Sequence, residues 1–541
     1  MRILGICGGV RMGNWDAAAT LAVDGQVVAA AEEERFTRVK HAPGNLPTHA
    51  IRYCLRAGGL RIQDIDLVVF PGITYRNIEA RLREYFLFVH GHAPKIELCD
   101  HHEAHAAAAF LGSGFDEALV VTYDYSGDGV ATTVSAADRR GLRSLRRWPF
   151  PQSLGLFYAT ITQHLGFDFG EDEYKVMGLA SYGHPSIALD WLLSPSKADY
   201  KLNDEGFRSA GPGEPPLSTQ EPLFNHALLQ RLGPARLRWE EIGPRHMDLA
   251  SSAQALLEKT ALGLFAHYRA ETGLRRACIA GGVAMNCVLN QKIAEAGLFD
   301  ALHVPPVAGD NGLALGAALL AGWQRGLPLP PPLSTAAMGP EYGELEIAKA
   351  LSEVGSPSRE CPDPAAEAAR MVAEGKIVGW HQGRMEYGAR ALGHRSILAD
   401  PRLAEMKDRV NAVVKFREGF RPFAPSVLLE NAGDFFERPV ESPFMTRTFG
   451  VRAQARARIP AVTHADNTAR VQTVRAEAEP LYHRFLAELG RRTGVPVVLN
   501  TSFNIRGQPI VENPNQAIST FYGSGLDALF LGKRVIEKKR P

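Results

Sequence analysis

Short apolar segments separated by glycine-containing turns dominate the first 150 positions of the chain. The first set lies at residues 2–8, 17–23 and 26–31. The second set lies at residues 118–122, 130–136 and 142–148. Asp24-Gly25 separates the second and third segments of the first set, and Asp128-Gly129 precedes the second segment of the second set. Asp-Gly between two apolar runs is typical of a β-hairpin. The pattern therefore predicts the same three-stranded arrangement twice.

Two later segments continue this pattern of strands followed by polar turns. Residues 277–290 predict a short strand, a Gly281-Gly282 turn and the start of a helix. Another apolar strand beginning at Val304 is expected to end at Asp310, before a helix over residues 313–321. Duplicated hairpins with glycine-rich turns predict an α/β fold of the actin and sugar-kinase ATPase class, which contains two ribonuclease-H-like halves.

A proline-rich stretch at residues 327–333 predicts a boundary, because it fits neither a helix nor a central strand. Beyond it we expect helices at residues 365–374, 403–414 and 475–493. Strands are expected at residues 376–381, 496–500 and 528–531. The prediction is two domains, residues 1–335 and 336–541, and the second is again α/β.

The bulk composition narrows the class of protein. The 541 residues include 60 basic and 59 acidic side chains, and this balance weighs against a nucleic-acid partner, which would require a basic surface. The six cysteines are scattered without a CxxC pair, which favours a reduced, cytoplasmic setting. The first apolar stretch is interpreted as a strand and not as a signal peptide, and no run of about 18 apolar residues predicts a membrane span.

A histidine pair is the first candidate for chemistry. His101 and His105 are four residues apart, so on a helix both imidazoles project from one face and can bind one metal ion. The strand that follows leads to Asp124 and to a turn containing Gly127, so a carboxylate can complete the set. The alternative is a pair of solvated or core histidines on an alanine-rich helix.

Arginines gather among glycines and aromatic residues in the second half of the chain. Residues 383–396 contain three arginines, and residues 415–421 contain three further cations. Guanidinium groups match the geometry of phosphate, and nearby glycines allow backbone N–H groups to join, so an anion pocket is predicted. The alternative is a solvated basic loop. Residues 500–507 supply further donors, although helix caps and loop hydrogen bonds explain each of them equally well.

Six stretches resemble motifs of the O-carbamoyltransferases of antibiotic and nodulation-factor biosynthesis, such as tobramycin O-carbamoyltransferase. They are AEEERFTR (31–38), HHEAH (101–105), EYKVMGLA (173–180), AGGVAMN (280–286), GRMEYGARALGHRS (383–396) and FRPFAPS (420–426). The resemblance covers essentially the whole chain. It implies an N-terminal domain similar to the metal-dependent tRNA threonylcarbamoyl transferase and a C-terminal domain similar to threonylcarbamoyl-AMP synthase.

The resemblance also implies a reaction in two steps. Carbamoyl phosphate and Mg-ATP form carbamoyl-AMP in the C-terminal domain, and a hydroxyl of a small-molecule acceptor then takes the carbamoyl group in the N-terminal domain. The implied metal ligands are His101, His105, Asp124 and Asp310. The family suggests iron(II), while manganese and zinc fit the same ligand types.

The same resemblance assigns two further sets of residues. The nucleotide-binding set of the N-terminal domain is Gly127, Lys175, Gly281, Gly282 and Asn286. The carbamoyl phosphate and ATP set of the C-terminal domain is Arg390, Lys415, Arg421, Asn500, Thr501 and Arg506.

The chain departs from the family where the acceptor is activated. The family often has His-Asp after the first strand, whereas this chain has Trp15-Asp16, and tryptophan cannot accept a proton. Either Asp16 or His41 acts as the base instead, or the acceptor is activated in another way; the expected catalytic residues are Asp16, Lys40 and His41. As part of an apolar wall, Trp15 favours a bulky, polyketide-like acceptor over a polycationic aminoglycoside.

Two other functions compete with O-carbamoyl transfer. A tRNA-modifying threonylcarbamoyl transferase would need a surface for tRNA, and the near-neutral charge weighs against it. A non-catalytic nucleotide-dependent regulatory ATPase would leave the arginine-rich pocket without a purpose. The resemblance leaves a homodimer open.

Overall fold

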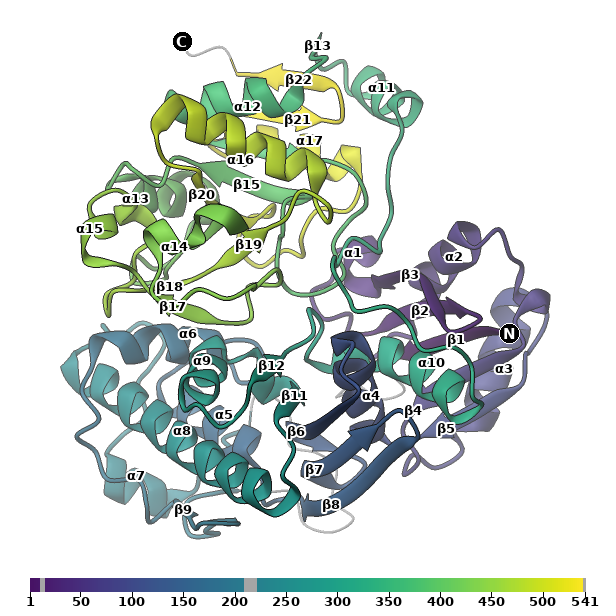
Figure 1. Cartoon of the computed structure of the whole chain (residues 1–541), viewed down its shortest axis with the longest axis vertical. Helices are drawn as coiled ribbons and strands as arrows, with labels where there is room; N and C mark the ends of the chain where they lie inside the picture. Colours follow the sequence, from purple (N-terminus) through teal and green to yellow (C-terminus); the bar gives the residue numbers. More distant parts are fainter. Residues whose placement is uncertain (10–14, 209–220, 539–541) are drawn as a thin grey trace. The chain divides into compact units, whose positions relative to one another are not determined.

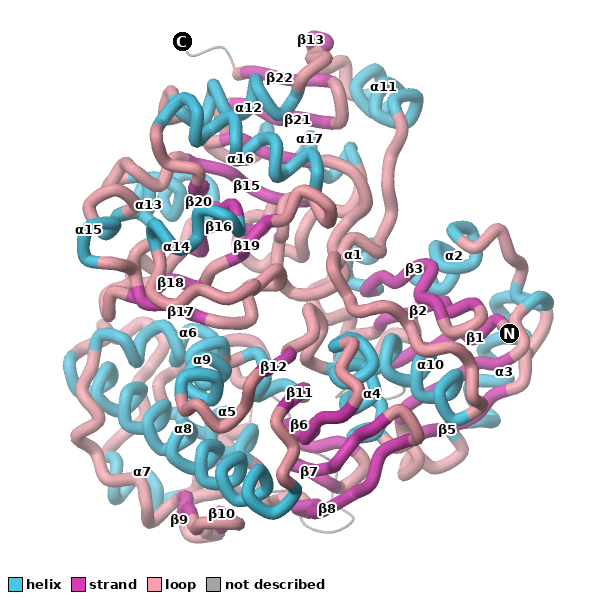
Figure 2. Tube along the Cα trace, in the orientation of Figure 1, coloured by secondary structure: helices cyan, strands magenta, loops and turns pink. Residues whose placement is uncertain are grey.

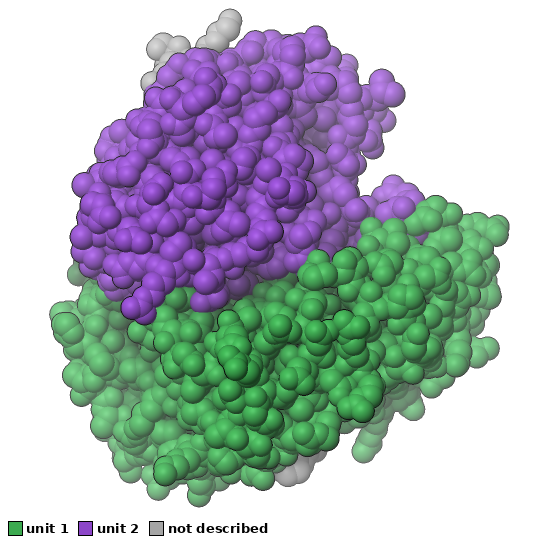
Figure 3. Space-filling view, in the orientation of Figure 1, with its two compact units in different colours: residues 1–28, 43–46, 58–332 green, residues 29–42, 47–57, 333–541 purple. Residues whose placement is uncertain are grey.

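The computed structural model describes residues 1–9, 15–208 and 221–538, and the chain divides into two compact units (Figure 3). Unit 1 comprises residues 1–28, 43–46 and 58–332. Unit 2 comprises residues 29–42, 47–57 and 333–541. Two segments near the N-terminus, which include α1 (Glu33–Thr37) and α2 (Thr48–Ala57), thus belong to the same unit as the C-terminal part.

Two five-stranded sheets repeat one topology. The first has the order β3-β2-β1-β4-β5, with β1 (Arg2–Cys7), β2 (Ala18–Val23), β3 (Gln26–Glu32), β4 (Leu67–Pro71) and β5 (Ile96–Cys99). The second has the order β8-β7-β6-β11-β12, with β6 (Glu117–Gly127), β7 (Val130–Asp138), β8 (Gly141–Pro149), β11 (Arg276–Ala280) and β12 (Ala301–His303). In both sheets the first two strands are antiparallel, and the two later strands add in parallel beside the first.

The hairpin turns have the backbone that the sequence predicts. Asp24 and Gly25 have φ of 50° and 83°, and Asp128 and Gly129 have φ of 51° and 77°. Positive φ at both central residues is required by the tight turn whose twist matches that of two antiparallel strands. The duplicated, ribonuclease-H-like α/β arrangement is therefore confirmed.

Eight helices accompany these sheets in the described part of unit 1. They are α3 (Ile78–His90), α4 (His101–Ser113), α5 (Leu154–His164), α6 (Glu173–Leu179), α7 (His226–Leu232), α8 (Pro244–Thr272), α9 (Cys287–Glu295) and α10 (Leu313–Gln324). A small ribbon is formed by β9 (Leu193–Pro195) and β10 (Tyr200–Leu202). Helix α10 approaches α4 very closely, since a Cβ at Gly316 would lie 1.9 Å from the carbonyl oxygen of Ala104. The alanine-rich helix with the histidine pair is thus fixed by packing.

Unit 2 is built on a mixed sheet of eight strands with the order β13-β22-β21-β14-β15-β20-β16-β19 (Figure 1). These strands are β13 (Arg359–Glu360), β14 (Val378–His381), β15 (Arg395–Ala399), β16 (Ala424–Leu428), β19 (Gln472–Val474), β20 (Val497–Ser502), β21 (Ala528–Leu531) and β22 (Arg534–Glu537). Its later helices are α11 (Glu344–Glu353), α12 (Pro364–Ala373), α13 (Met406–Val410), α14 (Ala432–Phe435), α15 (Ala453–Arg456), α16 (Pro480–Thr493) and α17 (Pro514–Tyr522). A separate two-stranded ribbon consists of β17 (Thr448–Gly450) and β18 (Thr468–Arg470).

The eight-stranded sheet is buried on both faces, and strand β20 shows this directly. Val497 and Leu499 belong to one buried cluster, and Val498 between them belongs to another. Successive side chains of a strand point to opposite faces, so a continuous apolar run is expected where both faces are covered. Helices α12 and α16 lie over one face of this sheet (Figure 1), and their buried side chains share a cluster with Val498.

Some predicted boundaries were wrong. Helix α16 begins at Pro480 and not at residue 475, because proline lacks an N–H and fits the first turn of a helix but not its interior. Helix α13 covers only Met406–Val410 and continues as a π-helical turn over Asn411–Lys415.

Residues 325–343 contain no helix or strand (Figure 2). No helix in the described ranges combines the length and apolar character needed to cross a bilayer.

Candidate functional site

Helix α4 begins directly at the histidine motif because carboxylates bind its first N–H groups. The side chain of Asp100 accepts a hydrogen bond from the N–H of His102 at 2.9 Å. Asp128 accepts one from the N–H of His101 at 3.0 Å. The first N–H groups of a helix have no partner within the helix, so such caps define its start. His101 and His105 consequently lie one turn apart on the same face, as predicted.

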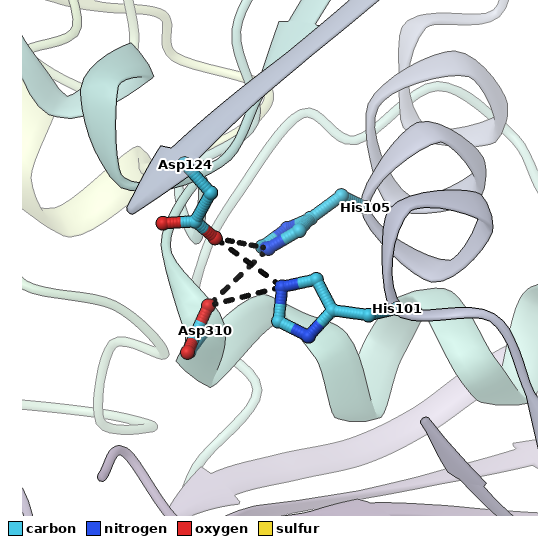
Figure 4. Close-up of side chains that lie close together, drawn as sticks. All are labelled: His101, His105, Asp124 and Asp310. Atoms are coloured by element: carbon cyan, nitrogen blue, oxygen red, sulfur yellow. Dashed lines mark hydrogen bonds and ion pairs between the residues drawn. The ribbon is translucent and has the colours of Figure 1, made fainter. Parts of the chain in front are cut away.

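Two carboxylates face these imidazoles (Figure 4). The Nε2 atom of His105 lies 3.1 Å from Oδ2 of Asp124 and 3.3 Å from Oδ1 of Asp310. The Nε2 atom of His101 lies 3.3 Å and 3.6 Å from the same two oxygens. All four donor atoms lie within 4.8 Å of one another. Ligands about 2.0–2.2 Å from a shared divalent ion have such mutual separations, so this donor set fits a metal centre.

Asp124 lies in the bulged end of β6, where backbone groups hold its side chain in place. The Oδ1 atom of Asp124 accepts hydrogen bonds from the N–H of Tyr125 at 2.7 Å and from the N–H of Gly282 at 3.3 Å. Gly281 has φ of 90°, and a Cβ there would lie 2.3 Å from the carbonyl oxygen of Tyr123. Both predicted glycines therefore lie against the strand that carries Asp124, and their role in nucleotide binding stays a prediction.

Asp310 lies in a turn, and not at the strand end that the sequence predicts. Strand β12 stops at His303, and Pro305 and Pro306 follow, which cannot donate to a strand ladder. Asp310 instead starts the 3-10 turn Asp310–Gly312 that leads into α10. The expectation of a strand from Val304 to Asp310 was wrong, but the carboxylate still joins the histidines.

The charges of the cluster are strongly coupled. Burial by itself would lower the pKa of His105, but the hydrogen bonds with Asp124 and Asp310 have a larger, opposite effect. The net result is a pKa raised to about 9. Burial raises the pKa of Asp124, yet its hydrogen bonds with both histidines hold it well below the ordinary value. Burial and the negative charge of Asp124 raise the pKa of Asp310. Without a cation the group therefore retains a proton that a divalent ion would displace.

Metal affinity is consequently expected to depend on pH. As the pH decreases below about 9, His105 keeps its proton, and the affinity should fall about tenfold per pH unit while one proton is displaced. The raised pKa also means that the proton on His105 stabilises the metal-free fold, a contribution lost as the pH rises through about 9. Calorimetric titration with manganese(II) or zinc(II) at several pH values measures the effect, and an affinity independent of pH would contradict it.

Gly127, predicted to contact nucleotide, packs against a predicted metal ligand. A Cβ added at Gly127 would lie 2.1 Å from Cδ2 and 2.2 Å from Cγ of the His101 ring. Real carbon atoms do not approach so closely, and the imidazole cannot retreat without leaving the carboxylates. The missing side chain thus makes room for His101.

The Gly127→Ala variant is therefore expected to displace His101 and to weaken metal binding by about 10- to 100-fold, the range seen when the support of a ligand is lost. Metal content after dialysis against buffers of fixed free metal concentration measures the loss. Gly433→Ala is the matched control, because nothing lies within 4 Å of a Cβ at that position. Equal metal content in both variants would show that the ring adjusts freely.

Lys175 and Asn286, also predicted to bind nucleotide, lie on neighbouring segments of unit 1. The Nζ atom of Lys175 donates to Asp172 at 2.8 Å. Asn286 caps helix α9, and the next residue, Cys287, lies 3.8 Å from the sulfur of Met177. The structure brings these segments together, while a bound nucleotide remains a prediction.

The three predicted catalytic residues are divided between the units. Asp16 belongs to unit 1, where the thiol of Cys7 lies 3.4 Å from the Asp16 carbonyl oxygen and 3.3 Å from that of Asp310. This shared contact places the Asp16 backbone beside a metal-ligand candidate. Lys40 and His41 belong to unit 2, in the turn after α1.

In unit 2 the buried ammonium of Lys415 is surrounded by oxygen atoms. Its Nζ donates to the carbonyl and hydroxyl oxygens of Ser502 at 2.5 and 3.1 Å and to the carbonyl and amide oxygens of Asn504 at 3.2 and 2.7 Å. Burial, followed by the positive charges of Arg417 and Arg421, lowers the pKa of Lys415 well below its ordinary value. A phosphate dianion would relieve this accumulation of positive charge.

A single carboxylate connects two further predicted cations. Glu418 lies 3.5 Å from Arg421 and 3.8 Å from Arg506. Arg506 also donates to the carbonyl oxygen of Phe416 at 3.3 Å. The segments after Lys415 and after strand β20 therefore meet, as an anion pocket requires. Glu418 was not selected from the sequence, although an acidic residue between two cations could have indicated its role.

The loop that carries Arg390 folds around Glu386. One carboxylate oxygen of Glu386 accepts hydrogen bonds from the N–H groups of Leu392, His394 and Arg395 at 2.7, 2.9 and 3.1 Å. Three backbone donors on one oxygen fix the curvature of the loop. Glu386 was not selected from the sequence, because its burial, which marks it as the centre of this loop, is visible only in the folded chain.

Strand β20 holds the same loop from the other side. The amide of Asn500 donates to the carbonyl oxygen of Ala391 at 3.1 Å, and the amide of Gln472 donates to that of Leu392 at 2.7 Å. Thr501 follows Asn500 on the strand. Asn500, Thr501 and the loop of Arg390 are thus brought together, and Gln472 completes their support. Carbamoyl phosphate binding by these residues stays a prediction.

The chain matches two protein-family models. Carbamoyltransferase N-terminus matches residues 5–92 and 88–319, and Carbamoyltransferase C-terminus matches residues 369–538. Nodulation protein NolNO from Sinorhizobium fredii is 38% identical over 97% of this chain and 79% of its own length. The 3'-hydroxymethylcephem-O-carbamoyltransferase of Amycolatopsis lactamdurans is 34% identical over 47% of each chain.

Among solved structures, component A of the (R)-2-hydroxyglutaryl-CoA dehydratase of Acidaminococcus fermentans covers 60% of this chain and 98% of its own, with a TM-score of 0.36 and 15% identity. The two family models together cover more than half of the sequence, and both belong to the same enzyme family. The chain therefore belongs to the carbamoyltransferase family, and it is a carbamoyltransferase enzyme.

Proposed function

We propose that this carbamoyltransferase is an ATP-dependent O-carbamoyltransferase that works in two steps. In unit 2, carbamoyl phosphate, ATP and water give carbamoyl-AMP, inorganic phosphate and pyrophosphate. In unit 1, the oxygen of an acceptor hydroxyl attacks the carbonyl carbon of carbamoyl-AMP. The C–O bond to AMP breaks, the hydroxyl proton passes to a base, and AMP leaves with the electron pair.

The cationic loops of unit 2 carry this proposal. Lys415, Arg421 and Arg506 come from segments that meet at the end of β20, and an enzyme supplied with a ready-made carbamoyl donor would not need them. Phosphoryl and adenylyl transfers are catalysed mainly by positioning and by charge neutralisation. Lysine and arginine donors at this point would neutralise carbamoyl phosphate and the triphosphate of ATP.

The four donors of unit 1 would hold a divalent ion, for which iron(II) is our first candidate and manganese or zinc the alternatives. Their separations support this assignment, as does the burial of His101, His105 and Asp124. When bound, such an ion supplies a positive charge that anchors the adenylate phosphate and favours its departure. Asp16, which belongs to the same unit as the four donors, would accept the proton of the acceptor hydroxyl; His41 and the preceding Lys40, of unit 2, are the alternative candidates from the sequence.

The acceptor that we propose is a bulky, largely apolar metabolite with a free hydroxyl. The ring of Trp15 covers Gly170, where a Cβ would lie 2.1 Å from it, and Tyr125 stacks on Phe169 with ring centroids 6.3 Å apart. These aromatic groups lie in the same unit as the metal candidates. The name of the Amycolatopsis relative specifies a hydroxymethyl group of a small molecule, which also supports an alcohol acceptor.

A product assay tests the proposal. The full-length protein is mixed with ATP, carbamoyl phosphate, iron(II) and a panel of hydroxylated macrolides, ansamycins and aminoglycosides. We expect AMP to appear together with an acceptor heavier by one carbamoyl group. Acceptor carbamoylation that proceeds without ATP would contradict the two-step scheme.

A further inference from the structure

The acidic and basic segment at residues 31–38 contains a buried ion network. Glu32 and Arg35 are only 5% and 2% exposed. The guanidinium of Arg35 lies 2.7 Å from Oε2 of Glu32 and 2.7 Å from Oε1 of Glu34. A buried ion pair contributes little net stability, since the cost of desolvation offsets the attraction. Such a pair is better explained by a requirement for a specific geometry.

This network binds both polar groups of one glycine in the Arg390 loop. Arg35 donates to the carbonyl oxygen of Gly388 at 2.7 Å, and the N–H of Gly388 donates to Glu32 at 3.4 Å. Gly388 has φ of 127°, a conformation that side chains disfavour. It precedes Arg390 by two residues, so the direction of the chain at Gly388 determines where Arg390 lies.

The next basic residue of the segment binds the loop of Arg506. The two terminal nitrogens of Arg38 donate to the carbonyl oxygens of Ile510 and Pro509 at 2.6 and 2.7 Å. Pro509 follows Arg506 by three residues. Both hydrogen bonds come from one planar guanidinium, a geometry that a lysine cannot reproduce.

The network also extends to a predicted catalytic residue. Glu34, which pairs with Arg35, accepts a hydrogen bond from the backbone N–H of His41 at 2.6 Å. Residues 382–394 and 503–513, all of them described, contain no helix or strand, so side-chain hydrogen bonds of this kind contribute to their conformation. One ion network therefore supports two predicted anion-binding loops and the turn of His41.

We propose that Arg35 and Arg38 are positioning residues for carbamoyl-AMP formation: Arg35, together with Glu32, orients the Arg390 loop, and Arg38 orients the Arg506 loop. This inference rests on the proposed function of unit 2. It gives the N-terminal motif AEEERFTR a role in the chemistry of the C-terminal half.

The test uses full-length Arg35→Lys and Arg38→Lys variants, which keep the charge but lose the planar fork. Carbamoyl phosphate-dependent exchange of labelled pyrophosphate into ATP reports on unit 2 without any acceptor. We expect the KM for carbamoyl phosphate or ATP to rise about tenfold in each variant, as when one charge-assisted hydrogen bond is lost, with a nearly unchanged kcat. Arg56→Lys, at an exposed site of α2, is the matched control and should behave as wild type.

The outcomes separate positioning from a structural role. The inference would be overturned if the lysine variants showed a lower thermal midpoint and less active enzyme but unchanged KM values. Failure of both lysine variants to fold would also overturn it. Unchanged KM values and stability would overturn it as well. If the wild-type protein itself shows no carbamoyl phosphate-dependent exchange, the proposed function fails and the inference fails with it, a result distinct from each of the outcomes above.

Discussion

His105→Ala is expected to eliminate metal binding and to lower carbamoyl transfer more than about 100-fold, since loss of a direct ligand exceeds the effect of losing its support. His105 is fully buried and lies within hydrogen-bond distance of both carboxylates, so alanine leaves no replacement donor. Pyrophosphate exchange should persist, because the predicted adenylate chemistry belongs to the other unit. Metal analysis, transfer assays and exchange assays on the same preparation measure all three quantities.

His102→Gln is the matched control on the same helix. The ring of His102 contacts the hydroxyl of Thr122 at 2.7 Å and the carbonyl oxygen of Val130 at 3.0 Å, and a glutamine amide can satisfy both groups. Metal content and transfer should therefore stay near the wild-type level. Transfer at the wild-type rate by a metal-free His105→Ala protein would remove the metal from the mechanism.

Lys415→Met is expected to raise the KM for carbamoyl phosphate in pyrophosphate exchange by about 10- to 100-fold, the equivalent of one charge-assisted contact. Methionine retains the length and apolar stem of the side chain and removes only the cation. The oxygens of Ser502 and Asn504 would lose their donor, so the thermal midpoint should decrease as well.

Exposed Lys533→Met provides the matched control for the loss of one positive charge. Its KM and thermal midpoint should equal those of the wild type. If Lys415→Met loses stability while its KM stays unchanged, Lys415 is a structural cation and carbamoyl phosphate binds elsewhere.

Local patterns explain why much of the fold could be predicted. The Asp-Gly turns at residues 24–25 and 128–129 act within a few residues, and both adopt the positive φ values that a tight hairpin needs. The predicted start of α16 was wrong because residues 475–479 look helical in the sequence, while Pro480 excludes a start before it. The helical spacing of His101 and His105 likewise depends only on neighbours in the chain.

Contacts between distant residues could not be predicted in this way. Gly127 resembles a phosphate-binding glycine in the sequence, but its missing Cβ makes room for the ring of His101. Glu386 and Gln472 support the Arg390 loop through hydrogen bonds to backbone groups, which carry no side-chain signature. The attachment of Arg35 to Gly388 spans 353 positions of the chain.

The amino-acid order alone was sufficient for the duplicated hairpins, the α/β class and the family, because these follow from short-range periodicity and contiguous motifs. It also identified the histidine pair and the cationic loops as candidates for chemistry. The convergence of Asp124 and Asp310 on that pair, and of residues 31–38 on the loops of unit 2, required the folded chain. Packing and burial determine which distant groups meet, and hydrogen bonds to backbone atoms fix the loops between strands.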